Sequence, residues 1–277
     1  ALAITDTAVV QAFPDAFSAG KAFAGSLKLI YGMTAFMVDD ERPVLWFGRG
    51  QSLRDTYVVF DIETTGLITS CDSLTEIGAV KIKDGKIIER FSEFVNPGRP
   101  IPRKIQELTH ITDDIVRDAP RIEEVLPRFM DFCAGAVLVA HNSDFDISFI
   151  KKECQKLDLP VDFTYMDTLE LARHLFPEFK RYGLDYLSKE LEVSLSQHHR
   201  AVYDAEATAG VLLKMFQRLE EIGVHDLNDV LTWAQQNPIN WEKQRPTQIM
   251  ILTKTRAGLL NLYKMVSESH INTFAGV

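Results

Sequence analysis

Two carboxylates stand two residues apart in the segment YVVFDIETTGL, which covers residues 57–67. The apolar run before them predicts a buried β-strand, and side chains i and i+2 of a strand point to the same side. Asp61 and Glu63 are therefore able to reach one metal ion. Taken alone, the pattern is also compatible with a polar strand end that enters a turn at Gly66.

Two later segments carry further candidates for the same site. LVAHNSDFDISF predicts a strand followed by a helix that opens near Asp146. Helix capping is the alternative role for this acid, although Asp144 is the more obvious cap. In HHRAVYDAEATA, His199 lies five residues before Asp204, which is one turn into a predicted helix. An ordinary helix start with an exposed histidine is the alternative there.

Together these residues form the inventory that phosphodiester hydrolysis needs. Two divalent cations, Mg²⁺ or Mn²⁺, about 3.5–4 Å apart, require hard oxygen ligands, and a base of suitable pKa must take a proton from the attacking water. Histidine titrates near neutrality and is the natural base. The candidates are Asp61, Glu63, Asp146 and Asp204 as ligands, with His199 as the base.

The pattern of strands and helices between these motifs predicts an α/β unit over about residues 56–222. Three strand-like runs come first, the last two joined by the turn KDGK. One more strand and several helices follow. The expected strands are 57–60, 74–82, 86–95 and 136–142, and the expected helices are 146–157, 165–176, 182–191 and 201–223.

The two ends of the chain also predict α/β structure. Residues 1–48 contain strand, helix and strand patterns, and residues 246–277 contain one strand and one helix. Neither end alone is able to cover both faces of a sheet, so we expect them to form one sheet interrupted by the central unit. Residues 223–245 predict a helical connector between the central unit and the second flank.

Composition restricts the class of protein. With 277 residues and 46% hydrophobic content, the chain is able to bury a sizeable core. It has no apolar run long enough to span a membrane and no secretion signal at its start, so we expect a cytoplasmic protein with no membrane partner. The net charge of −9 argues against extensive gripping of duplex phosphates. An acidic enzyme that holds cations is still able to act on nucleic acid.

The segments FDIETTG, HNSDFD and HHRAVYDAEAT resemble the three exonuclease motifs of the DEDD superfamily, in its histidine-containing branch. The resemblance covers about residues 56–222 and includes all five catalytic positions. It implies a ribonuclease H-like fold, a mixed sheet with flanking helices, and 3′–5′ exonuclease activity on a single-stranded or frayed DNA 3′ end.

The same resemblance implies a role for each candidate. Asp61, Glu63 and Asp204 would hold one metal, with Asp61 bridging to the second. Asp146 would support the second metal directly or through water, and His199 would be the general base.

Four further residues are candidates for substrate binding. In relatives, the backbone near the turn of Thr65 and Gly66 meets the terminal nucleotide. Arg200 is a candidate phosphate contact, with an exposed surface arginine as the alternative. Phe145 we interpret first as a core residue and retain as a candidate contact with the substrate.

The flanks resemble parts of the PHP domain of bacterial replicative DNA polymerase III alpha subunits. A PHP domain interrupted by an exonuclease is the arrangement of the PolC type. This implies a proofreading fragment whose partners are the remaining polymerase domains and replisome components. Where that family often has metal ligands, this chain has Thr7 and Thr34, which are poor ligands, so we expect a structural role for the flanks.

Two other functions stay open at this stage. An exonuclease acting on RNA ends would carry the same motifs, because discrimination depends on contacts to the 2′-hydroxyl. A catalytically silent scaffold module of the replisome is the third possibility. It would be favoured if one of the five catalytic positions were replaced, and none is.

Overall fold

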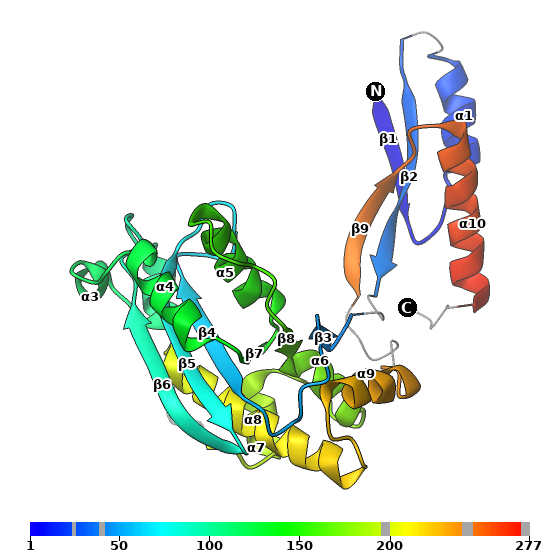
Figure 1. Cartoon of the computed structure of the whole chain (residues 1–277). Coiled ribbons are helices and arrows are strands. Elements are labelled where there is room, and N and C mark those ends of the chain that lie inside the picture. Colours follow the sequence, from blue (N-terminus) through cyan, green and yellow to red (C-terminus); the bar gives the residue numbers. More distant parts are fainter. Residues whose placement is uncertain (24–25, 39–41, 195–199, 240–245, 273–277) are drawn as a thin grey trace. The chain divides into compact units, whose positions relative to one another are not determined.

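The computed structural model forms two compact units (Figure 1). The central unit is Arg42–Ile239, and the flanking unit combines Ala1–Glu41 with Asn240–Val277. Each unit has its own sheet and its own hydrophobic core. The described residues are 1–23, 26–38, 42–194, 200–239 and 246–272.

A six-stranded mixed sheet forms the middle of the central unit, which confirms the predicted fold class. Its strands lie in the order β3-β8-β7-β4-β5-β6. β4, β7 and β8 run parallel to one another, whereas β3, β5 and β6 pair antiparallel with their neighbours. The strands are β3 (Leu45–Trp46), β4 (Tyr57–Thr64), β5 (Leu74–Lys83), β6 (Lys86–Phe94), β7 (Val137–Ala140) and β8 (Tyr165–Asp167).

Helices cover both faces of this sheet. Residues of α6, α7, α8 and α9 build one core, and residues of α4 and α5 build the core on the opposite face. The helices are α2 (Arg103–Thr109), α3 (Asp113–Val116), α4 (Ile122–Phe132), α5 (Asp144–Lys156), α6 (Thr168–Leu175), α7 (Leu184–Glu190), α8 (Ala201–Glu221) and α9 (Leu227–Gln236).

Strand β4 is buried on both sides, which explains its continuous apolar run. Tyr57 and Val59 belong to the core that contains α8, whereas Val58 and Phe60 belong to the core of α4 and α5. All four are fully buried. Because side chains alternate along a strand, Asp61 continues the series that faces α8.

One predicted helix begins as a strand. The main chain of Tyr165–Asp167 pairs with β7 and forms β8, so sheet pairing prevails over the helical pattern of the sequence. Helix α6 begins only at Thr168, where Asp167 is its N-cap and accepts a hydrogen bond from the Leu169 N–H at 2.8 Å. Helix α5 begins at Asp144, two residues earlier than predicted.

Residues 42–48 do not belong with the first flank, to which we assigned them from the sequence. Leu45 and Trp46 pair with β8 as an edge strand of the central sheet. Val44 and Leu45 are 2% and 5% exposed within the core of the central unit. Their burial in that core is the physical reason for the difference.

The flanking unit joins both ends of the chain in one sheet, as the sequence predicted. Its strands lie in the order β1-β2-β9, with β1 parallel and β9 antiparallel to β2. Its core gathers around Phe13, Met33 and Leu262, where both helices pack on one face of the sheet. The elements are β1 (Leu2–Thr7), α1 (Phe13–Lys21), β2 (Leu29–Met37), β9 (Thr247–Leu252) and α10 (Arg256–Asn272).

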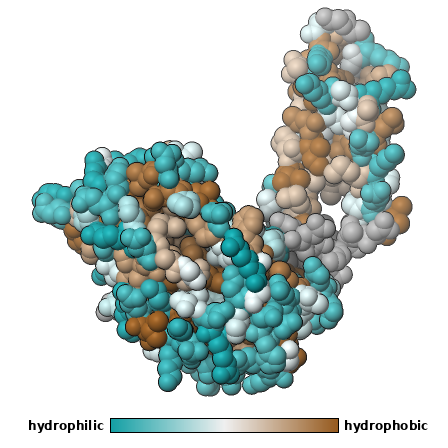
Figure 2. Space-filling view, in the orientation of Figure 1, coloured by the Kyte–Doolittle hydropathy of each residue, from teal (hydrophilic) through white to brown (hydrophobic). Residues whose placement is uncertain are grey.

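The other face of this small sheet carries exposed apolar residues. Register places Phe36, Met250 and Leu252 on the side opposite the helices, and they are 45%, 64% and 50% exposed. Figure 2 shows hydrophobic side chains on the surface of this unit. Among the helices of the described ranges, none has the length and apolar character to cross a bilayer.

Helix α8 lies very close to β5 at Gly78. A Cβ atom at this glycine would lie 2.0 Å from the Val202 nitrogen and 2.2 Å from the Ala201 carbonyl carbon. Gly78 pairs with Asp61 across the β4-β5 ladder. The absence of a side chain at Gly78 therefore lets the first turn of α8 lie over the acidic end of β4.

We expect Gly78→Ala to lower the free energy of unfolding of the central unit by about 3 kcal/mol, because backbone atoms of α8 must move away. Gly183→Ala is the control, since nothing lies within 4 Å of a Cβ there and its φ is −65°. It should cost less than about 1 kcal/mol. Urea denaturation measures both, and equal stabilities would contradict the close approach.

Candidate active site

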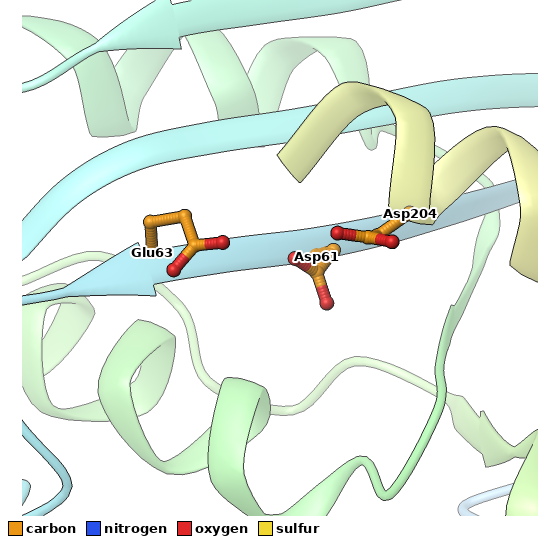
Figure 3. A group of neighbouring side chains, drawn as sticks. All are labelled: Asp61, Glu63 and Asp204. Carbon is orange, nitrogen blue, oxygen red and sulfur yellow. The ribbon is translucent and has the colours of Figure 1, made fainter. Parts of the chain in front are cut away.

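Three carboxylates meet at the end of β4. Asp61 and Glu63 extend from this strand and Asp204 from the first turn of α8 (Figure 3). One ligand oxygen from each lies within 4.8 Å of the others. The structure therefore brings together three of the four acids that the sequence predicted.

Asp146 lies next to this cluster, on the first turn of α5. It is 3% exposed, and its Oδ1 accepts a hydrogen bond from the Ile62 N–H at 3.2 Å. This bond fixes the carboxylate to the backbone of β4, at the residue between Asp61 and Glu63 in the sequence. Burial raises the pKa of Asp146 well above its usual range, more than the hydrogen bond lowers it.

The negative charges of the site act on one another. Burial raises the pKa of Asp61 well above its usual range, and the charges of Asp146, Glu63 and Asp204 raise it further. Close carboxylates resist ionising together unless a cation joins them. The group of carboxylates around Asp61 is therefore suited to binding a cation.

Glu63 shows the same effect. Burial raises its pKa to about 8, with further increases from Glu76 and Asp204, and Arg200 partly offsets them. Arg200 is itself engaged with Glu76, so its charge does not neutralise the cluster. Clustered carboxylate oxygens with uncompensated charge fit a hard divalent cation such as Mg²⁺ or Mn²⁺.

Glu76 is a site residue that the sequence analysis missed. It lies opposite Glu63 on β5 and is fully buried. Its oxygens accept hydrogen bonds from Arg200 Nη2 at 3.0 Å and Nε at 3.2 Å, and from the Ala201 N–H at 3.3 Å. These hydrogen bonds to Glu76 hold the start of α8, and with it Asp204, against the sheet. An acid within the apolar run LTEIGAV was the available signal.

The structure thus gives Arg200 a partner inside the protein. Its guanidinium lies 4.8 Å from the centre of the Phe94 ring and pairs with Glu76. Its predicted contact with substrate stays a prediction. His199, the residue before it, lies outside the described residues.

The turn after β4 is organised by Asp72, another residue that the sequence analysis missed. Thr65 is 1% exposed, and its hydroxyl donates to Asp72 Oδ1 at 3.2 Å. Asp72 Oδ2 accepts from the Ile68 N–H at 2.9 Å. A Cβ at Gly66 would lie 2.5 Å from this carboxylate, so any larger residue there would have to displace Asp72. The side chain of Thr65 is therefore held inside the turn.

Phe145 lies at the edge of the core. It is partly buried, packs against the core of α4 and α5, and its ring centroid is 5.2 Å from that of Phe149. This agrees with its interpretation as a core residue. Its contact with substrate stays a prediction.

The chain is similar along nearly all its length to polymerases. It is 48% identical over 274 residues to the DNA polymerase III PolC-type of Caldanaerobacter subterraneus subsp. tengcongensis. It is 46% identical over 284 residues to the DNA polymerase III PolC-type of Bacillus subtilis. Each alignment covers 99% of this chain and 19% of the relative, so the chain spans about a fifth of their length.

Solved structures show the fold of the central unit. The crystal structure of E. coli exonuclease I in complex with a dT13 oligonucleotide matches with a TM-score of 0.55 at 18% identity, over 61% of this chain and 42% of that one. The Exonuclease family matches residues 58–212, more than half of the chain, and this range contains the acids at the end of β4, on α5 and on α8. The chain therefore belongs to the Exonuclease family.

Proposed function

We propose that the central unit is a metal-dependent 3′–5′ exonuclease that hydrolyses phosphodiester bonds at DNA 3′ ends. The observation that carries this proposal is the cluster of Asp61, Glu63 and Asp204, whose oxygens lie within 4.8 Å of one another. Membership in the Exonuclease family supports the class of reaction.

In this proposal the four acids share two cations. Asp61, Glu63 and Asp204 would hold one cation, and Asp61 would also help to hold the second one. Asp146 would support the second cation directly or through water. When bound, Mg²⁺ or Mn²⁺ supplies Lewis-acid activation of a water and stabilises charge on the leaving oxygen.

We assign proton transfer to His199. An imidazole that titrates near neutrality is suited to take the proton of the attacking water. The next residue along the chain, Arg200, is fixed to the buried Glu76.

The substrate we propose is a single-stranded or frayed DNA 3′ end. E. coli exonuclease I has the same fold, and its structure holds a dT13 oligonucleotide, which supports DNA as the class of substrate. The proposed contacts to the terminal nucleotide are the backbone at Thr65 and Gly66, Phe145 and Arg200. Arg200 would contact a phosphate while it remains paired with Glu76.

We further propose that the exonuclease proofreads for a replicative polymerase. The similarity to DNA polymerase III PolC-type proteins over 99% of the chain supports this setting. The partners would be the remaining polymerase domains and other replisome components.

The flanking unit would be part of a PHP domain that other residues of the polymerase complete. Its exposed apolar sheet face around Phe36 and Met250 supports this view. We propose a structural role rather than a metal site for its residues. Asp6 Oδ2 accepts a hydrogen bond from the Ala12 N–H at 2.7 Å, and Thr34 is 9% exposed on the central strand.

The proposed function makes a prediction about catalysis. With Mg²⁺ or Mn²⁺ and a DNA primer carrying a 3′ mismatch, the protein should release mononucleotides from the 3′ end. Asp61→Asn should lower kcat at least about 1000-fold, because several kcal/mol of charge stabilisation are lost. His199→Ala should lower it at least about 100-fold.

Asp118→Asn is the matched control, since this acid is exposed and outside the cluster, and it should retain full activity. An RNA oligonucleotide of the same sequence should be cleaved more slowly. Release that Asp61→Asn does not change would contradict the assignment of the site, and faster cleavage of RNA would contradict the assignment of the substrate.

A further prediction concerns pH and metal binding. Glu63 has a pKa raised to about 8 against an ordinary 4.5, so protons compete with metal below pH 8. Affinity for Mn²⁺ should rise as the pH increases from 6 to 9, with protons released on binding. Because the folded-state pKa is the higher one, the metal-free protein should lose stability as the pH rises from about 5 to 9.

Titration calorimetry in buffers of different ionisation enthalpy measures the protons released, and thermal melting measures stability. Glu63→Gln should weaken Mn²⁺ binding and flatten both pH dependences. Proton release that is unchanged in Glu63→Gln would contradict the role of this carboxyl group.

A further inference from the structure

Six residues ahead of the family match form a strap along the edge of the central sheet. This strap, residues 42–47, precedes the matched range 58–212. Leu45 and Trp46 pair with β8, and Trp46 stacks on Tyr165 with ring centroids 4.5 Å apart. The Phe47 carbonyl accepts a hydrogen bond from the Thr164 hydroxyl at 2.7 Å. The strap is thus fixed to β8 by backbone, aromatic and side-chain contacts.

Arg42, at the start of the strap, bridges two helices that border the site. Its Nη2 pairs with Asp144, the first residue of α5, and its Nη1 lies 3.3 Å from Glu170 Oε1 on α6. Glu170 is fully buried and also pairs with Arg173 at 2.8 Å. A buried carboxylate held by two guanidinium groups is a firm anchor, because its alternative is an unpaired charge.

The strap also holds the turn from which α5 starts. The Val44 carbonyl accepts a hydrogen bond from the Asp167 N–H at 2.9 Å. The carboxylate of Asp167 is fully buried and accepts from the N–H groups of Asn142 at 3.0 Å and Ser143 at 2.9 Å. Asn142 has a φ of +63°, a left-handed conformation that asparagine adopts more readily than most residues, and the hydrogen bond to Asp167 stabilises it further.

These contacts converge on Asp146. The turn at Asn142 and Ser143 and the Arg42–Asp144 pair fix the chain on the N-terminal side of this acid, two to four residues away from it. On its other side, the Asp146 carboxylate is fixed by the Ile62 N–H. Small displacements of the first turn of α5 would therefore change where this carboxylate points.

We propose that Arg42 is a positioning residue of the exonuclease, which acts through Asp144 and the first turn of α5 to aim Asp146 at the second cation. The proposal rests on the function proposed above. In this proposal Arg42 contacts neither substrate nor cation and acts through its ion pairs with Asp144 and Glu170. Residues 42–47, which follow the first flank in the sequence, would thereby belong to the scaffold of the active site.

Manganese binding to the full chain tests this proposal, by titration calorimetry alongside steady-state kinetics on single-stranded DNA. Arg42→Ala should weaken the weaker Mn²⁺ binding step about 3- to 10-fold and lower kcat by a similar factor, with the KM for DNA within about 2-fold. Arg42→Lys should recover part of the affinity. Arg54→Ala is the control, because Arg54 pairs with Glu220 of α8 instead and should leave both values unchanged.

Asp144→Asn breaks the same ion pair without altering the strap and should reproduce the loss of Mn²⁺ affinity if Arg42→Ala does not fold. Wild-type Mn²⁺ affinity and kcat in a folded Arg42→Ala or Asp144→Asn protein would overturn the proposal. Failure of the exonuclease function is a separate result, because wild-type protein would then release no nucleotide while calorimetry still compares Mn²⁺ binding between variants.

Discussion

Repulsion among the carboxylates held together at the end of β4 constrains the whole central unit. Oxygens of Asp61, Glu63 and Asp204 lie within 4.8 Å of one another, Asp146 lies next to them, and burial raises the pKa of Asp61, Glu63 and Asp146. Without a cation, the chain must hold these groups against their own repulsion and desolvation. The surrounding fold is best understood as the scaffold that prevents them from moving apart.

Different contacts fix the three elements that carry these acids. β4 is buried on both faces, so its end cannot move without disturbing two cores. The Glu76–Arg200 pair and the bare backbone at Gly78 fix the start of α8 over that strand. Asp167 and the strap fix the turn before α5. Preorganisation of this kind is what a catalytic metal site needs from its protein.

Much of this could be predicted from the sequence. The period-two spacing of Asp61 and Glu63, the hairpin at KDGK and the helix containing Asp204 depend on local patterns, and the structure reproduces them. The strand Tyr165–Asp167 was missed because only its pairing with β7 makes it a strand. Glu76 and Arg200 are 124 residues apart in the sequence, and Arg42 and Asp144 are 102 residues apart. A local sequence pattern therefore could not predict either ion pair. The available sequence signal for Glu76 was the position of an acid within the apolar run LTEIGAV.

The acids at the end of β4 should bind the cations that we propose for hydrolysis. Anomalous diffraction from crystals soaked with Mn²⁺ and a mononucleotide would locate these cations. We expect two anomalous peaks about 3.5–4 Å apart, one of them at coordination distance from Asp61, Glu63 and Asp204. Crystals that bind the nucleotide but show no Mn²⁺ peak among these three carboxylates would contradict this expectation.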